Sequence, residues 1–192
     1  MSVIDTLITN RTAEDVTAVK ALNVIGLSGM TAEQKIAYLA GMRGAYNASD
    51  LNRVEEASLY MSELLRDVYE GLQSYAASLG VAPQAFFDPY DPDDYAITVK
   101  TDWTTADYIS AADNARYLAN VVLLTSAVLG DYPALPSSLA RLDYIKANNI
   151  ERSLVLLRDN LLELETRLRA EIYNASRAWY YSGDVYAGEV EA

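Results

Sequence analysis

Apolar residues recur every three or four positions along two long stretches of this chain, and polar residues fill the positions between them. The stretches cover residues 49–79 and 147–179. The recurring positions are Leu51, Val54, Ser58, Met61, Leu65, Val68, Leu72, Tyr75 and Leu79 in the first, and Ile150, Leu154, Leu157, Leu161, Leu164, Leu168, Ile172, Ala175 and Trp179 in the second. This spacing predicts two long helices, each with one apolar stripe of the coiled-coil type. We expect the stripes to pack as an antiparallel pair, with any surplus buried between copies in a homo-oligomer.

Three shorter helices are predicted from signals at their starts. Thr12, Thr31 and Ser110 are each followed three positions later by an acidic or amide residue, which is the pattern of an N-terminal capping box. The glycines and prolines that follow predict helices over about 12–29, 31–44 and 110–129. Small residues share one face of the third helix, and we expect another helix to approach closely there: Ala112, Ala115, Ala119 and Ser126.

The fold class predicted from these elements is all-α, a helical bundle with two long helices. Pro83, Pro89 and Pro92 exclude a regular helix from the Pro/Asp-rich loop 80–94. The β-prone residues 95–101 (YAITVKT) predict a short strand or an extended arm. We divide the chain into N-terminal short helices (1–45), a helical bundle core (46–179) that includes this loop, and an irregular tail rich in Tyr and Gly (180–192).

A six-residue pattern, Ala-x-(Asp or Asn)-x-x-Arg, occurs three times, each time where a helix is expected to begin. The copies span residues 48–53, 111–116 and 147–152. The Asp or Asn and the Arg are three positions apart and can touch along a helix, although the helix dipole disfavours an Arg in the first turn. We expect each Arg to pair with that residue or to hold the preceding loop. The pattern therefore indicates a repeated architectural device.

The composition excludes several kinds of catalytic and metal-binding site. The chain has 192 residues, a formal net charge of −12, no Cys and no His. Thiolate nucleophiles, Ser-His-Asp arrangements and Cys- or His-bound metals are therefore excluded. The negative charge disfavours nucleic acid and anionic lipid as partners, and no apolar stretch reaches the roughly 20 residues of a membrane span. We expect a soluble protein with no secretory signal, no cofactor and no catalytic residue.

Acidic residues are the remaining candidates for chemistry. Four aspartates of the Pro-rich loop could hold Ca²⁺, but the EF-hand spacing is missing and a solvated turn is the simpler interpretation: Asp88, Asp91, Asp93 and Asp94. Two pairs, Glu55 with Glu56 and Glu163 with Glu165, are of the type that glycoside hydrolysis uses. Both pairs lie off the apolar stripes, so we expect them to face solvent.

Aromatic residues are the candidates for binding. The chain has 15 Tyr against two Phe and two Trp, and Tyr is enriched at protein interfaces as well as at the rims of cores. Trp103 precedes a helix, where it serves either as a hydrophobic anchor or as a contact for a neighbouring subunit. The candidate interface residues are Trp103, Trp179, Tyr180, Tyr181 and Tyr186.

Several segments resemble a module found in proteins of tailed phages and prophages of Gram-positive bacteria, which are commonly encoded among tail, tail-tip and fibre genes. The likeness extends over most of the chain, and the segments that carry it are 10–16 (NRTAEDV), 44–55 (GAYNASDLNRVE), 100–104 (KTDWT), 113–120, 181–184 (YSGD) and 187–189 (AGE). The resemblance implies a structural role in the tail, baseplate or fibre region of the virion. It brings no catalytic residues, and residues 82–94 depart from it as an insert.

Three functions follow as hypotheses. The first is a non-enzymatic virion structural protein, assembled in the bacterial cytoplasm as a homo-oligomer and bound to other phage structural proteins. The second is a cytosolic assembly factor or fibre chaperone that is absent from the mature particle. The third, which the sequence favours least, is a carbohydrate-active or cation-dependent enzyme that uses carboxylates.

Overall fold

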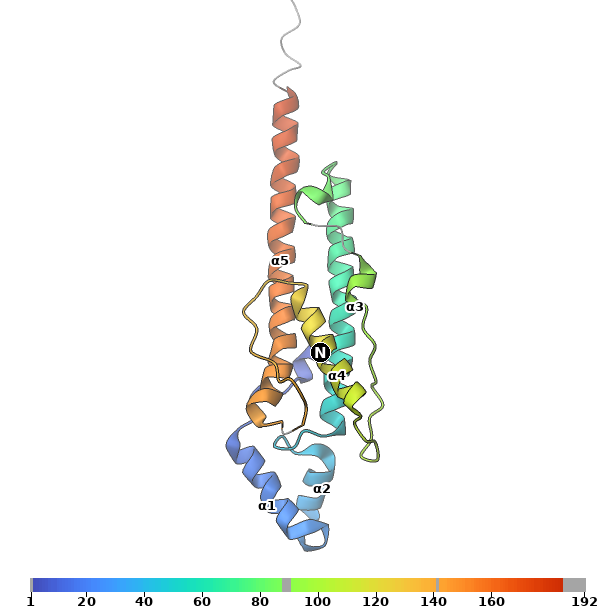
Figure 1. Cartoon of the computed structure of the whole chain (residues 1–192). Coiled ribbons are helices and arrows are strands. Elements are labelled where there is room, and N and C mark those ends of the chain that lie inside the picture. The colour runs from blue at the N-terminus through green and yellow to red at the C-terminus, as the bar shows by residue number, and fades with distance from the viewer. Residues whose placement is uncertain (1, 88–90, 141, 185–192) are drawn as a thin grey trace, which may run out of the picture.

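The chain forms an elongated helical structure in a computed structural model, which describes residues 2–87, 91–140 and 142–184, with the side chains of 92, 93 and 179–184 excepted (Figure 1). The α-helices are α1 (Ala13–Gly29), α2 (Ala32–Gly41), α3 (Ala48–Ser78), α4 (Ala111–Ser126) and α5 (Tyr144–Asp184). Three short 3-10 helices, η1 (Val3–Thr6), η2 (Pro83–Ala85) and η3 (Pro92–Tyr95), complete the regular structure. The expected all-α fold is confirmed.

The β-prone segment near residues 95–101 does not form a strand. Its first residue ends η3, and the rest runs extended without a partner strand among the described residues. A strand needs a neighbour that shares its hydrogen bonds, whereas here the Tyr95 and Thr98 carbonyls accept from side chains of α3 and α4. Of the two alternatives, the extended arm describes this segment.

The predicted helix starts are confirmed by their hydrogen bonds. Thr12, Thr31 and Ser110 each cap a helix with a reciprocal capping box, and Asn47 does the same for α3. The helix ends agree less well with the prediction than the helix starts do. Helix α4 stops at Ser126 instead of about 129, and α5 runs from Tyr144 to Asp184, past its expected limits of 147 and 179.

The two long helices pack together along their predicted stripes, but they run parallel. The starting portions of both meet where Arg53 pairs with Glu151, and much further along both helices the Arg169 guanidinium lies over the Tyr75 ring. The antiparallel expectation is therefore wrong (Figure 1). The stripe residues buried between them are Leu51, Val54, Ser58, Met61, Leu65, Val68 and Leu72 on α3, and Ile150, Leu154, Leu157, Leu161, Leu168 and Ile172 on α5.

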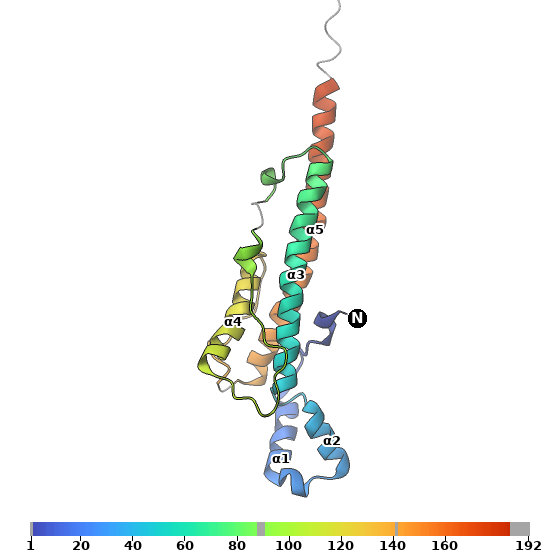
Figure 2. The same cartoon turned by 90° about the vertical axis from the view of Figure 1, so that its right-hand side faces the viewer.

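Helix α4 runs in the same direction as α3 and α5 and packs on one side of that pair, while η1 lies on the other (Figure 2). Its bulky residues point inwards: Tyr117, Leu118, Val121 and Leu124 are buried. Its small residues, for which we expected a close helix neighbour, are exposed instead: Ala112, Ala115, Ala119 and Ser126. Burying the bulky face of α4 removes more apolar surface from water than burying its small residues would, which explains why the bulky face points inwards.

Two long connectors make three parallel helices feasible. Residues 79–110 and 127–143 each return the chain from the end of one helix to the start of the next (Figure 1). Helix α3 rises on the order of 46 Å and α4 on the order of 24 Å, and extended chain covers about 3.3 Å per residue, so each connector is long enough for its return path. Short connectors would have enforced antiparallel neighbours.

Helices α1 and α2 form a hairpin beyond the end of the bundle where α3 and α5 begin (Figure 1, Figure 2). The loop from α2 to α3 rests against α1, since a Cβ added at Gly44 would lie 2.0 Å from the Asp15 carbonyl oxygen. At the opposite end, the last turns of α5 project past the end of α3. In the described residues, no helix has both the length and the apolarity needed to span a bilayer.

Candidate functional site

Four charged side chains meet where α3 and α5 begin, and we call them the ionic cluster: Arg11, Asp50, Arg53 and Glu151. Asp50 takes part twice. One oxygen, Oδ2, accepts from the Asn47 amide at 2.9 Å and closes the capping box of α3. The other, Oδ1, accepts from Arg11 Nη2 at 2.7 Å and from Arg53 Nη2. The first copy of the six-residue pattern thus does pair its Asp with its Arg.

Glu151, from the second turn of α5, completes the ionic cluster. Its Oε1 accepts from Arg11 Nη2 at 2.6 Å and from Arg53 Nη2 at 3.2 Å, and its Oε2 accepts from the Ile8 amide. One turn earlier, Asn148 accepts from the Arg11 amide and donates to the Arg11 carbonyl, both at 2.9 Å. The N-terminal segment is therefore fastened to α5 by side chains on one face of that helix.

The charges of the ionic cluster balance and are shielded from water. The Arg11 side chain is 2% exposed and that of Glu151 is 0% exposed. Burial opposes the charge on Arg53, but the hydrogen bonds and charges of Glu151 and Asp50 outweigh it and raise the pKa of the guanidinium. Removing one member of such a buried set would leave an uncompensated charge in the interior. The cluster therefore specifies how three chain segments meet.

A second buried ion pair lies one turn further along α3. Glu55 is 1% exposed, and its two oxygens accept from Arg116 Nη1 at 2.9 Å and Arg116 Nη2 at 2.6 Å. The expectation that Glu55 faces solvent is wrong, because α4 covers this side of α3. Glu56 and Glu163 are exposed as expected, whereas Glu165 is half-buried and pairs with a neighbour on its own helix.

Arg116 also holds the connector that precedes its helix. Its Nη1 donates to the Thr98 carbonyl at 2.7 Å, and Asn120 Nδ2 donates to the same oxygen at 2.8 Å. In the second copy of the pattern, therefore, the Arg fastens the preceding loop, which was one of the two expected roles. In the third copy, Arg152 is exposed, and the buried contacts come from Asn148 and Glu151, which the pattern leaves unspecified.

Asparagines near the helix starts hold the connectors against the bundle. Asn52 donates to the Trp103 carbonyl at 3.0 Å and accepts from the Trp103 amide at 2.7 Å. Asn114 accepts from the Leu139 amide at 3.0 Å, and Asn149 donates to the Ala134 carbonyl at 3.0 Å. Sequence reasoning did not identify Asn52 and Asn114, and it singled out Asn149 only as a partner for Arg152. The signal was present, since Asn is a poor residue for a helix interior unless its amide has a partner.

Two buried phenols lie beside the ionic cluster. The hydroxyl groups of Tyr46 and Tyr117 hydrogen-bond to each other, which links the loop before α3 to α4. Burial, followed by the negative charge of Glu151, raises the pKa of Tyr46. Burial also raises the pKa of Tyr117, with the nearby Tyr46 adding to the effect. Both phenols are therefore held in the neutral form.

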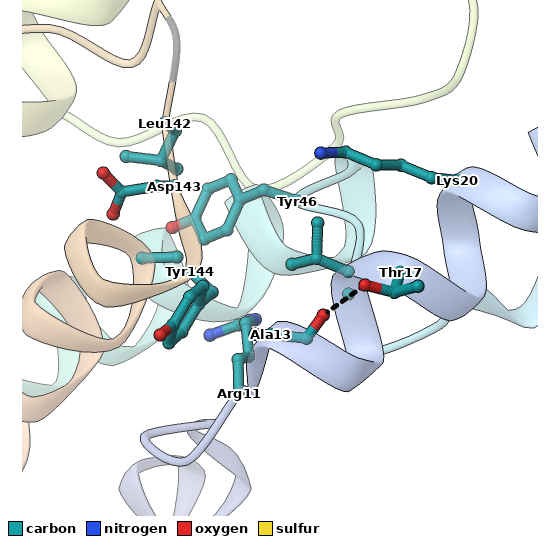
Figure 3. A pocket seen from close by; sticks show the side chains of 11 residues that line it. Arg11, Ala13, Thr17, Lys20, Tyr46, Leu142, Asp143 and Tyr144 are labelled. Atoms are coloured by element: carbon teal, nitrogen blue, oxygen red, sulfur yellow. Dashed lines mark hydrogen bonds between the residues drawn. The ribbon is translucent and has the colours of Figure 1, made fainter.

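Arg11 and Tyr46 also border a cavity of about 410 Å³ between α1, the loop before α3 and the start of α5 (Figure 3). Lys20 of α1 and Tyr144 of α5 lie on its walls. Its one carboxylate from the described residues is Asp143, whose Oδ1 already accepts from a backbone amide of α5 at 2.8 Å. The cavity thus offers cations and aromatic faces, but not the two carboxylates that glycoside hydrolysis requires.

The predicted interface residues lie in different places. The Trp103 side chain is 5% exposed and belongs to the hydrophobic core, with Lys100 Nζ 4.0 Å from its ring centre. This position is that of a hydrophobic anchor and leaves almost no surface for a neighbouring subunit. The side chains of Trp179, Tyr180 and Tyr181 and the whole of Tyr186 lie outside the described residues.

The acidic loop is described only in part. Asp88 and the side chain of Asp93 lie outside the described residues. In the remainder of the described chain, no group of three or more acidic side chains is placed to hold a metal ion. The calcium-binding alternative for this loop therefore stays a hypothesis from the sequence.

The α1/α2 hairpin, which lies beyond the end of the bundle, carries five exposed large apolar side chains. We call these five the tip surface: Val24, Ile25, Leu27, Ile36 and Leu39. Val24 is 89% exposed, Ile36 is 71% exposed and Leu39 is 73% exposed. Exposed apolar residues that gather in one element are typical of an interaction surface.

Comparisons with protein families, with curated proteins and with solved structures find no match to this chain. Its function is therefore inferred from its own residues and their geometry, together with the resemblance described above.

Proposed function

We propose that this chain is a non-enzymatic virion structural protein of a tailed phage or prophage, which assembles with itself and with other tail, baseplate or fibre proteins. The resemblance of its segments to such a module suggests the context. The observation that carries the non-enzymatic part is the use of the buried charged side chains. Arg11, Asp50, Glu55 and Glu151 are all engaged in ion pairs that fasten helix starts and connectors.

Their structural role accounts for the burial and pairing of these residues, and no catalytic role is needed to explain them. A catalytic carboxylate needs access to substrate and a pKa suited to proton transfer. The buried acids of this chain instead have two or more donors each and almost no exposed surface. Three parallel helices held at one end by such pairs make a stiff, elongated body, which suits a subunit that acts by its shape.

The alternative is an assembly factor or fibre chaperone. The tip surface favours it, because a chaperone also needs exposed apolar residues to hold an unassembled partner. Mass spectrometry of purified particles separates the two proposals. We expect the chain to be present in a stoichiometric ratio to other tail proteins. Its absence from mature particles, combined with its presence in infected cells, would reject the virion proposal and favour the assembly factor.

A further inference from the structure

We propose that the cavity of about 410 Å³ between α1, the loop before α3 and the start of α5 binds a small organic acid, which carries one carboxylate on an apolar or aromatic body (Figure 3). This inference goes beyond the structural role proposed above, which assigns no ligand to the chain.

Arg11 gives the wall of this cavity a donor without an acceptor. The Arg11 side chain lines the cavity and is 2% exposed. Its Nη1 donates to the Ile8 carbonyl, and its Nη2 donates to Asp50 and Glu151. Its Nε is also buried, but it has no hydrogen-bond partner among the described residues. Buried N–H groups are rarely left unpaired in native proteins, and a carboxylate oxygen bound against this wall would supply the missing acceptor.

The charges around the cavity favour a ligand with one negative charge. Lys20 lines the cavity and forms no ion pair with a described residue. Its side chain extends towards Tyr46, whose ring centre lies 5.4 Å from the guanidinium carbon of Arg11 (Figure 3). Asp143 is already paired, with the Lys146 amide at 2.8 Å and the Lys146 ammonium at 3.1 Å. One cation therefore remains for the ligand, and a doubly charged phosphate would keep one charge uncompensated.

The rest of the lining suits an apolar body. Val16, Leu142 and Ala147 form part of the walls, together with the side chains of Tyr46 and Tyr144. Apolar and aromatic side chains around a few polar groups are typical of sites for small organic ligands, and the volume of this cavity lies in the range of such sites. An inorganic anion would gain nothing from these walls, so charge and lining together indicate an organic acid.

A ligand in this cavity would contact the α1/α2 hairpin and the bundle at once. Helix α1 and the start of α5 lie on opposite sides of it (Figure 3). A ligand that binds only this arrangement stabilises it by mass action. We therefore expect binding to slow the hydrogen exchange of the α1 amides.

The first test compares three probes on the isotope-labelled full chain by amide NMR spectroscopy. Phenylacetate should cause saturable shifts at the amides of Gly44 and Ala147, which both line the cavity. Phenylacetamide has the same body without the charge, and it should bind roughly tenfold more weakly because a hydrogen bond to a charged group is lost. Inorganic phosphate should cause no saturable shift at these amides.

The second test uses variants of the chain. Lys20→Met should weaken the binding of phenylacetate roughly tenfold and leave that of phenylacetamide unchanged. The matched control is Lys35→Met, which removes the same charge from α2 outside the cavity and should bind as the wild type does. Ala13→Leu adds apolar bulk to the cavity wall without changing the charge, so it should weaken both probes. Helical circular dichroism of each variant checks that it is folded.

Four results would overturn the inference. The first is no saturable shift with phenylacetate at concentrations of tens of millimolar, and the second is equal binding of phenylacetate and phenylacetamide. The third is binding of phosphate as strong as that of phenylacetate, which would make the cavity a site for inorganic anions. The fourth is equal weakening by Lys20→Met and Lys35→Met, which would show that the overall charge governs binding. None of these results bears on the particle measurement.

Discussion

Replacing Arg11 by Met should destabilise the protein more than any other single change of a charged residue on its N-terminal segment. The substitution keeps an unbranched apolar stem of similar length but removes the guanidinium. Arg11 Nη2 lies 2.7 Å from Asp50 Oδ1 and 2.6 Å from Glu151 Oε1, and Arg11 Nη1 donates to the Ile8 carbonyl at 2.7 Å. After the change, Arg53 alone would face both carboxylates.

The expected loss follows from the burial of this group. Removing one partner from a buried set of ion pairs costs about 3–5 kcal/mol, because one of the two carboxylate charges would then be left uncompensated in the interior. With a denaturant slope of roughly 2 kcal/mol/M for urea, a loss of about 4 kcal/mol lowers the midpoint of unfolding by about 2 M. Arg11→Lys should recover only part of this, since one ammonium cannot reproduce the planar fork that spans two carboxylates.

Urea titration followed by helical circular dichroism measures this loss, and Arg158→Met is the matched control. Arg158 also joins α5 to the N-terminal segment, through Asp5 at 3.0 Å, but it is partly exposed. Its removal should cost less than about 1 kcal/mol. If Arg11→Met costs no more than Arg158→Met, the ionic cluster does not fasten the segment in the way described here.

Three further changes test other parts of the structure. Leu161→Ala, at a fully buried position of α5, should cost about 2–5 kcal/mol of unfolding free energy, whereas its exposed neighbour Leu162→Ala should cost roughly 0.5 kcal/mol or less in the same titration. Gly44→Ala should loosen the hairpin, because its Cβ would lie 2.0 Å from a carbonyl oxygen of α1; faster hydrogen exchange of the α1 amides measures this. Burial raises the pKa of Tyr46 and Tyr117 above the ordinary 10.0, so stability that is complete below pH 10 should fall as the pH rises further. Tyrosinate absorbance recorded during alkaline unfolding should then appear together with loss of helix, and its appearance in a fully helical protein would contradict the burial of these phenols.

Much of the secondary structure could be predicted because its signals are local. Ser110 and Asp113 form their capping box within one turn, and the structure has it as the sequence indicated. The stripe from Leu51 to Leu72 required only the helical period and the apolar character of its side chains. In both cases, the residues that decide the outcome are close together in the chain.

The buried polar contacts could not be predicted in the same way. Glu55 was expected in solvent because it lies off the stripe of α3, but α4 buries that side and supplies Arg116. Asn52 and Asn148 hold the backbone of Trp103 and Arg11, and those partners are distant in the chain. An Asn or Glu on a helix carries no local signal that names its partner.

The sequence by itself determined that this protein is helical, where most of its helices begin, and most of the apolar positions that the two long helices bury, because capping and periodicity act within a few residues. The tertiary structure alone decided that α3, α4 and α5 run in the same direction and that their first turns enclose a buried set of charges. Helix direction depends on the path of the long connectors, and the burial of a charge depends on which distant segment covers it. Neither is encoded in any short stretch of the chain.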